Sequence, residues 1–272
     1  MQLILTIDIG NTNIVIALFQ DDTILVTWRL NTEASRTGDE YGLMVGSLFR
    51  DDDIDSKQIE VSVLSSVVPS LIGPFVSLVE KKTGKKPFII NPSIFPLLPI
   101  KIPDSATHEI GSDLLCNAVE AYSRYHCACI VVDFGTALTF TVVGDDGKLL
   151  GIAITPGLGT ARDSLFKNTA QLPSIPLEAP PSSLGTNTIH SIQSGIVLGY
   201  KGLVEGLVSQ LKNDIYAQTG TLQDTIKVIA TGGLNSVLKP ITDVFQEVDK
   251  ALTLCGLHRI AKILHGISIE EN

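Results

Sequence analysis

The sequence predicts an α/β protein made of two related half-domains, each built on a mixed β-sheet with flanking helices. The first observation behind this prediction is a pattern that occurs twice, at Leu3–Asn13 and at Ile130–Ala137. In each copy an apolar, β-branched run of strand length ends in an aspartate, and a glycine and hydroxyl or amide residues follow. The second observation is that neither copy leads into a helix. Each is followed by another apolar run and a turn, as expected of an antiparallel return.

The elements of the first half follow from apolar periodicity and from capping residues. We expect strands at residues 3–8, 13–19 and 23–30, a helix at 37–49, a strand at 60–67, a helix at 70–83 and a strand at 87–90. The resulting order, βββαβαβ, resembles that of a ribonuclease-H-like half-domain. A proline-rich connection follows at 91–104, and a helix should open near Gly111 and run to Tyr125.

The second half repeats this plan. We expect strands near residues 130–133, 138–143 and 148–154, a helix at 160–169, a second proline-rich stretch at 172–181, a long glycine-spaced helix at 189–218, a strand at 226–231 and a closing helix at 252–264. The two ribonuclease-H-like half-domains are therefore predicted at 1–125 and 126–272, with the active site in the cleft between them.

Composition narrows the class of protein. Hydrophobic residues make up 44% of the 272 residues and charged residues 18%, which argues against disorder. The formal net charge of −9 provides no basic stripe for nucleic acid. No apolar run is long enough to cross a membrane, and the N-terminus does not read as a signal peptide. We interpret the four cysteines as reduced core thiols and expect a cytoplasmic protein.

The two aspartates that end the repeated strands are candidates for nucleotide chemistry. Asp8 and Asp133 would approach phosphates through a cation, and the glycine after each lets the backbone come close to an anion. Two carboxylates with water and phosphate oxygens suit Mg²⁺. A third glycine turn follows a buried strand at Thr231–Gly233. The alternative is that both aspartates only cap hairpin turns.

The motifs taken together resemble those of type III pantothenate kinases over nearly the whole chain. The stretches that carry the resemblance, in order, are Asp8–Asn13, Gly111–Asp113, Asp133–Ala137, Thr169–Pro173, Gly185–Thr188, Gln193–Gly195 and Thr231–Leu234. The resemblance implies the acetate-and-sugar-kinase/Hsc70/actin fold. It also implies transfer of the ATP γ-phosphoryl group to the primary hydroxyl of pantothenate, the first step of coenzyme A synthesis.

The resemblance also implies roles for single residues. Asp113 matches the catalytic proton acceptor, Asp133 the ligand of K⁺ or NH₄⁺, and Asp8 is a candidate for Mg²⁺. The residues implied to bind ATP are Asp8, Ile9, Gly10, Asn11, Thr12, Asn13, Ile14, Val15 and Thr136. Those implied to bind pantothenate are Gly111, Ser112, Asp113, Leu114 and Thr188.

The chain departs from the family pattern on the acceptor side. The family's Gly-Ala-Asp-Arg is replaced here by a stretch that ends in Ser112, Asp113 and Leu114, so the arginine beside the pantothenate carboxylate is missing. Arg162 is our candidate substitute, with a solvated helix residue as the alternative, and His108 could line the acceptor pocket. Two other functions stay open: a kinase for a different small hydroxy acid, and a non-catalytic relative like the Bvg accessory factors.

The helix predicted at 189–218 raises the question of assembly. Its glycines at 195, 199, 202 and 206 are spaced by four, three and four residues, which places them on one face. Glycine inside a helix is unfavourable by about 1 kcal/mol relative to alanine, so a packing partner is expected. That partner is either the protein's own sheet or a second copy. Because the resembling family is dimeric, we predict a homodimer.

Overall fold

The computed structural model describes residues 2–270 of the chain, with side chains described up to residue 266. The chain forms two compact units, one of residues 1–120 with 252–272 and one of residues 121–251. This division differs from the predicted ranges 1–125 and 126–272 at its C-terminal end. The closing helix packs on the first sheet.

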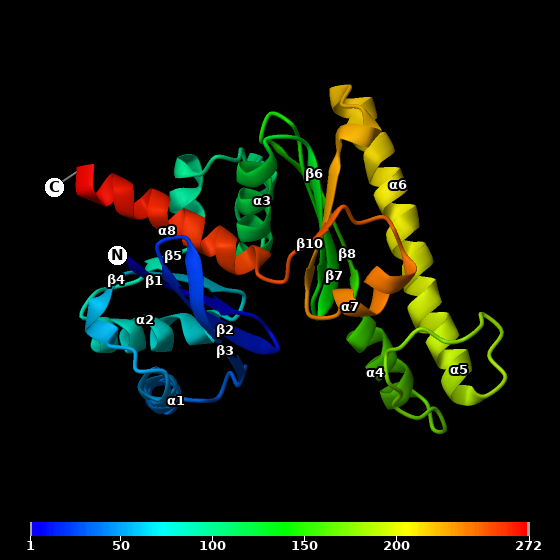
Figure 1. Cartoon of the computed structure of the whole chain (residues 1–272), viewed down its shortest axis with the longest axis horizontal. Coiled ribbons are helices and arrows are strands. Elements are labelled where there is room, and N and C mark those ends of the chain that lie inside the picture. Colours follow the sequence, from blue (N-terminus) through cyan, green and yellow to red (C-terminus); the bar gives the residue numbers. More distant parts are fainter. Residues whose placement is uncertain (1, 271–272) are drawn as a thin grey trace. The chain divides into compact units, whose positions relative to one another are not determined.

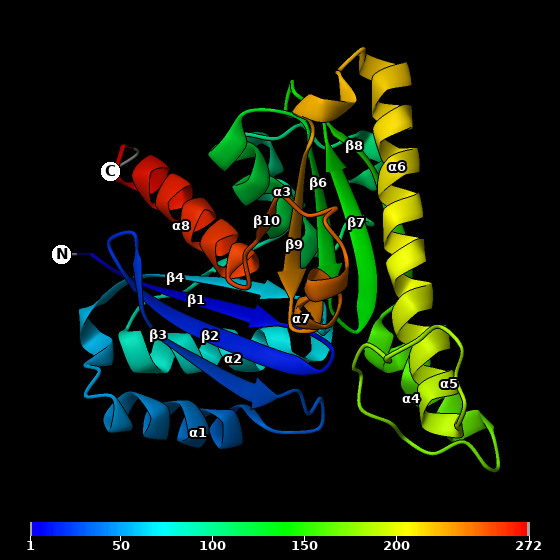
Figure 2. The same ribbon diagram turned by 45° about the vertical axis from the view of Figure 1, so that its right-hand side comes forward.

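The first unit contains a five-stranded mixed sheet in the order β3-β2-β1-β4-β5 (Figure 1). Its strands are β1 (Leu3–Ile9), β2 (Asn13–Gln20), β3 (Thr23–Asn31), β4 (Ile59–Ser66) and β5 (Phe88–Ile89). β1 pairs antiparallel with β2 and parallel with β4. Helices α1 (Gly38–Asp51) and α2 (Pro69–Thr83) cover one face, and α8 (Leu252–Glu270) covers the other (Figures 1 and 2). The predicted βββαβαβ order is confirmed.

The second unit contains a five-stranded sheet in the order β10-β9-β6-β7-β8. Its strands are β6 (Cys129–Phe134), β7 (Ala137–Val143), β8 (Leu149–Pro156), β9 (Lys227–Gly232) and the short β10 (Glu247–Val248), which the sequence did not reveal. β6 pairs antiparallel with β7 and parallel with β9, as β1 does with β2 and β4. The repeat seen in the sequence is therefore a repeat of topology. The helices of this unit are α4 (Leu158–Asn168), α5 (Thr188–Gln193), α6 (Gly199–Thr219) and α7 (Asn235–Leu238).

Local sequence explains where the helices begin and end. Thr37 caps α1 and forms a capping box with Glu40, whose carboxylate accepts the Thr37 amide at 2.7 Å. Gly84 ends α2 and Gly220 ends α6, each in the left-handed conformation that glycine adopts without steric cost. These signals are read from neighbouring residues alone, which is why the predicted ends lie close to the observed ones.

The long helix predicted at 189–218 is interrupted. It consists of α5, one π-helical turn at Ser194–Leu198 and α6. Its glycines at 195, 199, 202 and 206 are all exposed, and a Cβ built on any of them would meet nothing within 4 Å. The alternative that these glycines pack against the protein's own sheet is therefore wrong.

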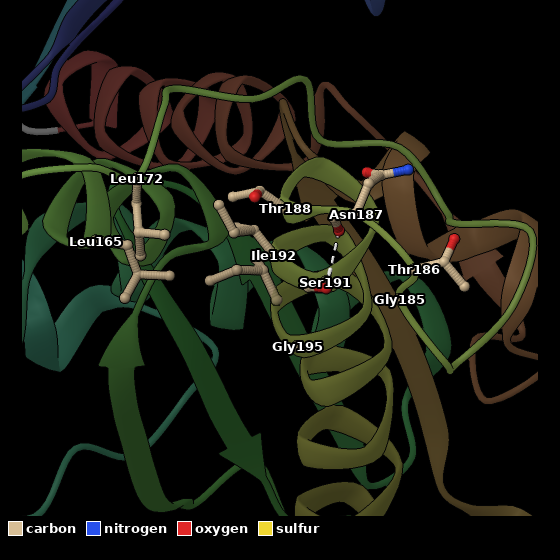
Figure 3. A pocket seen from close by; sticks show the side chains of 10 residues that line it. Leu165, Leu172, Gly185, Thr186, Asn187, Thr188, Ser191, Ile192 and Gly195 are labelled. Carbon is tan, nitrogen blue, oxygen red and sulfur yellow. Dashed lines mark hydrogen bonds between the residues drawn. The ribbon is translucent and has the colours of Figure 1, made fainter.

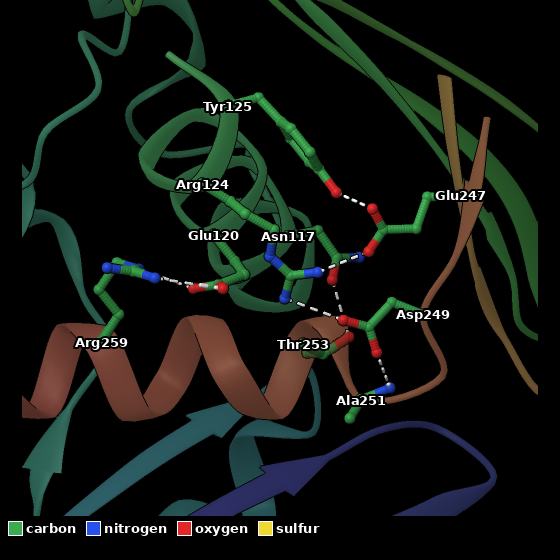
Figure 4. Close-up of polar contacts among 9 residues, drawn as sticks. All are labelled: Asn117, Glu120, Arg124, Tyr125, Glu247, Asp249, Ala251, Thr253 and Arg259. Atoms are coloured by element: carbon green, nitrogen blue, oxygen red, sulfur yellow. Dashed lines mark hydrogen bonds and ion pairs between the residues drawn. The ribbon is translucent and has the colours of Figure 1, made fainter. Parts of the chain in front are cut away.

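Helix α3 (Ser112–Tyr125) contains the boundary between the units, and its side chains bond within each of them (Figure 4). In the first unit Glu120 accepts hydrogen bonds from Arg259 of α8, the shorter at 2.7 Å. In the second unit Arg124 pairs with Glu247 at 2.8 Å and with Asp249 at 2.9 Å. The C-terminal turn of α3 is thus anchored to β10 and to the residue that follows it.

Among residues 2–270, no helix combines the length and the apolar character that crossing a membrane requires.

Candidate functional site

The first glycine turn joins β1 to β2 and is tightly closed. The amide of Gly10 donates to the carbonyl of Asn13 at 3.0 Å, and Thr32 holds the turn from the end of β3. The Thr32 hydroxyl donates to the Gly10 carbonyl at 2.7 Å, and its amide donates to the Thr12 carbonyl at 3.0 Å. With these carbonyls occupied, the turn presents its exposed residues Asn11 and Thr12 outward.

The residues predicted to bind ATP in this turn divide into two groups. Asn11 and Thr12 are exposed and could contact a ligand with their side chains. Ile9 and Ile14 are each 0% exposed and belong to the core of the first unit. Any contact these two make with a nucleotide therefore has to use the backbone, while their side chains position the strands.

Asp8 lies at the carboxyl end of β1 and is linked to the start of α3. Ser65, which is opposite Asp8 in the parallel ladder, donates its hydroxyl to Asp8 Oδ1 at 2.9 Å. The same Ser65 oxygen lies 2.8 Å from the hydroxyl oxygen of Ser112. The structure thus brings the predicted phosphate turn and the predicted acceptor residue Ser112 into one hydrogen-bonded chain.

Asp113 lies in the first turn of α3, where its Oδ1 accepts the amide of Leu114 at 2.9 Å. Burial raises the pKa of this carboxyl above its ordinary value, and the backbone hydrogen bond only partly opposes that effect. Gly111 leaves room for it, because a Cβ there would stand 2.5 Å from Asp113 Oδ1. A carboxylate with a raised pKa is a better proton acceptor for a hydroxyl group.

A cavity of about 400 Å³ lies beside this turn within the first unit. It is lined by Ser66, Val67, Ile90, Asn91, Pro92, Phe95, Thr107, His108, Ile110, Gly111 and Ser112. Two of the predicted acceptor residues therefore face one cavity, and His108 also lines it. Leu114 is only 7% exposed and does not line this cavity.

The second glycine turn, in the second unit, repeats the first. Gly135 donates its amide to the Ala137 carbonyl at 3.1 Å, and the carbonyl of Thr136 accepts from Gly157 at 2.9 Å and from the Thr160 hydroxyl at 2.6 Å. Gly157 precedes α4, and a Cβ there would stand 2.3 Å from the Gly135 carbonyl oxygen. The turn is thereby packed against the N-terminus of α4, with Gly135 and Thr136 exposed.

The surroundings of Asp133 fit a cation. In the sheet it is opposite Thr139 on one side and Thr231 on the other. Thr139 is 8% exposed, and its hydroxyl is buried with no hydrogen-bond partner among the described residues. Side-chain oxygens are the ligands that hard cations prefer, so a carboxylate beside an unsatisfied hydroxyl suits a cation. Within the described part of the chain, no group of three or more His, Cys, Asp or Glu residues could hold a metal.

Thr188 lies in a different part of the second unit, at the edge of a cavity of about 690 Å³ (Figure 3). Leu165, Leu172 and Ile192 form its apolar part, and Thr186 and Asn187 lie on its polar side. Arg162 is one turn before Leu165 on α4, and its guanidinium pairs with Asp163 at 2.7 Å. The candidate for the missing arginine therefore already has a carboxylate partner.

The structure groups the predicted site residues by unit. Asp8, the first turn, Gly111–Leu114 and the smaller cavity belong to the first unit, whereas Asp133, Thr136 and Thr188 belong to the second. Sequence reasoning missed Ser65, Thr32 and Thr139. A signal existed for Ser65, because a polar residue at the carboxyl end of an apolar strand parallel to β1 lies at the same edge as Asp8.

Sequence comparison identifies similar proteins over nearly the full length. The family model of type III pantothenate kinase matches residues 4–210. A type III pantothenate kinase of Geotalea uraniireducens is 40% identical over 255 residues, covering 94% of this chain and 96% of the relative. A protein of the same name from Myxococcus xanthus is 39% identical over 264 residues, covering 97% and 98%.

Comparison with solved structures extends the fold assignment. A Baf family transcriptional activator of Campylobacter jejuni matches with a TM-score of 0.58 at 17% identity, covering 96% of this chain and 99% of that one. MreB 5 of Spiroplasma citri, bound to AMPPNP, matches with a TM-score of 0.57 at 8% identity, covering 100% and 99%. A ROK family glucokinase of Streptomyces griseus matches with a TM-score of 0.51 at 14% identity, covering 96% and 99%. These likenesses establish the actin-like ATPase and sugar-kinase fold.

Proposed function

The chain belongs to the type III pantothenate kinase family, and on that premise we propose that it transfers the γ-phosphoryl group of ATP to the primary hydroxyl of pantothenate. The product, 4'-phosphopantothenate, is the first intermediate of coenzyme A synthesis. The observation that carries the proposal is Asp113, a carboxyl with a raised pKa that directly follows two residues lining a cavity, Gly111 and Ser112, and is linked through Ser112 and Ser65 to the phosphate turn.

Asp113 serves as the catalytic base in this proposal. Phosphoryl transfer passes through a loose transition state, so catalysis depends on positioning and on charge neutralisation. Asp113 orients the acceptor hydroxyl and takes its proton, while Gly111 and Ser112 line the cavity that admits the acceptor. Leu114 acts through its amide, which holds Asp113 Oδ1. Thr188 is also proposed to contact pantothenate.

The two glycine turns would bind the phosphates of ATP. Residues 8–15 and Thr136 are assigned to ATP, and among them Asn11, Thr12 and Thr136 have exposed side chains. We assign Mg²⁺ to Asp8 and K⁺ or NH₄⁺ to Asp133, where the unsatisfied Thr139 hydroxyl supports an oxygen-rich site. When bound, these cations neutralise phosphate charge. Because ATP is the donor, the proposal places the reaction in the cytoplasm.

We also propose that the protein acts as a homodimer through the face that carries the four exposed glycines of the 194–206 segment. Large apolar side chains are exposed close to it in sequence, with Leu184 81% and Ile189 46% exposed. Both residues flank the Gly185–Thr188 stretch that lines the larger cavity. Exposed glycines allow a second backbone to approach closely, and the apolar residues gain free energy when buried.

A coupled assay tests the reaction directly. The purified protein with ATP, Mg²⁺ and K⁺ should release ADP only when pantothenate is added, and mass spectrometry should show pantothenate gaining one phosphate. Asp113→Asn serves as the matched control, because it keeps the shape of the side chain and removes the base. Binding of ATP without any pantothenate-dependent ADP release would overturn the proposal. Turnover with another hydroxy acid instead would establish the alternative acceptor that the missing arginine leaves open.

A further inference from the structure

We propose that Ser65 is a positioning residue that couples the phosphate turn to the catalytic base through Asp8 and Ser112. The proposal rests on the proposed function, and all of its contacts lie within the first unit. Ser65 is 0% exposed, lies on β4 directly beside Asp8, and contacts Asp8 at 2.9 Å and Ser112 at 2.8 Å.

The direction of these hydrogen bonds follows from the number of protons that each side chain can donate. A serine hydroxyl has a single proton, and the ionised Asp8 carboxylate can only accept. Ser65 donates that proton to Asp8 Oδ1, so in the second bond its oxygen must accept, and Ser112 must donate. The series of hydrogen bonds therefore has a single direction: Ser112 donates to Ser65, and Ser65 donates to Asp8.

This series of hydrogen bonds connects β1 and α3, two elements whose relative position matters for phosphoryl transfer. At one end, the bond from Ser65 fixes Asp8 Oδ1 at the carboxyl end of β1, next to the turn that would hold phosphates. At the other end, Ser112 is the first residue of α3 and directly precedes Asp113. A shift of Asp8 on binding of a magnesium nucleotide is thereby passed to the turn that carries the base.

The side chain at position 112 decides whether the coupling reaches α3. Serine at 112 extends the Ser65–Asp8 bond to α3, whereas with alanine that bond would end at β4. The hydrogen bond to the charged Asp8 is the stronger link, and the bond between the two neutral hydroxyls is the weaker one.

Steady-state kinetics provide the first test. Ser65→Ala should lower kcat about ten- to a hundredfold and change the KM for ATP and for pantothenate less than about threefold. Ser112→Ala should lower kcat about fivefold. The double variant should be no slower than Ser65→Ala, because removing Ser65 already breaks both bonds. Ser62→Ala is the matched control, since Ser62 is a buried serine of the same strand at 4% exposure and should keep its kcat.

Hydrogen exchange gives a readout that does not depend on turnover. Binding of a magnesium complex of a non-hydrolysable ATP analogue should slow exchange at the first turn of α3, residues 111–118, in the wild type and in Ser62→Ala. It should have no such effect in Ser65→Ala. If Ser65→Ala does not fold, Ser112→Ala carries the same test, with a reduced protection expected.

The outcomes separate this inference from the proposed function. Wild-type protein that slows exchange on binding the analogue but phosphorylates no pantothenate would contradict the proposed reaction and leave the coupling in place. A wild type that phosphorylates pantothenate, with unchanged kcat and retained protection in Ser65→Ala, would overturn the coupling. Additive losses in the double variant would also overturn it, because the two serines would then act independently.

Discussion

Gly232 leaves no space between itself and Asp133: a Cβ at position 232 would stand 2.6 Å from Asp133 Oδ1. The backbone of Gly232 also has a φ of 85°, a conformation that side-chain-bearing residues rarely adopt. The third glycine turn of the sequence is therefore packed against the carboxylate of the second. Position 232 shapes the space around the proposed cation site.

The first prediction concerns that cation. Asp133→Asn should abolish the stimulation of activity by K⁺ or NH₄⁺, because it removes the charge that would bind the ion. Gly232→Ala should have a similar effect, because its methyl group would clash with Asp133 Oδ1 at 2.6 Å and with the Phe134 backbone at 2.7 Å, and so distort the proposed site. In Gly233→Ala the ratio of rates in KCl and NaCl should stay at the wild-type value, since a Cβ there meets nothing within 4 Å. Full stimulation by K⁺ in Asp133→Asn would show that the ion binds elsewhere.

The second prediction concerns Asp113. Its pKa is raised by burial, so ionisation of the folded protein is less favourable than ionisation of the unfolded chain. Stability associated with this group is greatest below the ordinary pKa of an aspartate and is lost as the pH rises through the raised value. Asp113→Asn should therefore raise the Tm at pH 7 while lowering kcat about 10²- to 10⁴-fold. In the wild type, the acid-side fall of kcat should lie at a higher pH than the ordinary pKa of an aspartate would give. A lower Tm for Asp113→Asn would contradict this account.

The third prediction concerns His258 of α8, which is 6% exposed and stacks on Phe19 with ring centroids 4.3 Å apart. Its Nε2 lies 2.7 Å from the Asp21 carbonyl, so the neutral ring donates there. Burial lowers its pKa in spite of that bond and of nearby Asp22. The unfolded chain then binds more protons, and stability is lost as the pH falls below about 6.5. Urea unfolding at pH 7.5 and 5.5 should show this loss, and His258→Gln should reduce it.

The fourth prediction concerns assembly. Gly202→Arg should yield a monomer, because the added side chain occupies the face proposed to contact a second copy. Its fold should be unaffected, since a Cβ at 202 meets nothing within 4 Å. Gly73→Arg is the matched control, an exposed glycine of α2 with the same open surroundings. Light scattering should show dimers for the wild type and Gly73→Arg. A dimer that persists in Gly202→Arg would place the interface elsewhere.

The fifth prediction concerns the acceptor's carboxylate. Leu114→Arg should lower the KM for pantothenate by about ten- to a hundredfold if the new side chain reaches out of the buried position of Leu114 and forms a charge-assisted bond with the carboxylate. Arg162→Ala should raise that KM without changing the KM for ATP, provided that Arg162 leaves Asp163 for the substrate. An unchanged KM in both variants would show that neither position contacts the carboxylate, and His108→Ala would then be the next variant to measure.

Much of this protein is determined by sequence alone. The glycine turns after Asp8 and Asp133, the strands around them and the caps at Thr37, Gly84 and Gly220 are local features, and each depends on residues that are neighbours in the chain. For the same reason the repeated topology was predicted correctly, since an apolar run, a turn and a second run specify an antiparallel pair wherever they occur. The family's motifs, which are also short, identified the reaction.

Only the tertiary structure decided how distant residues meet. The link from Asp8 through Ser65 to Ser112 joins positions 57 and 47 residues apart. The closing helix joined the first unit because its apolar face packs on β1 and β4, and periodicity shows that a helix has such a face without showing which sheet receives it. The glycines of the 194–206 segment proved to be exposed, and the Thr139 hydroxyl proved to be buried without a hydrogen-bond partner among the residues that the structure describes. Burial and pairing of this kind depend on contacts across the fold, and a linear sequence does not contain them in readable form.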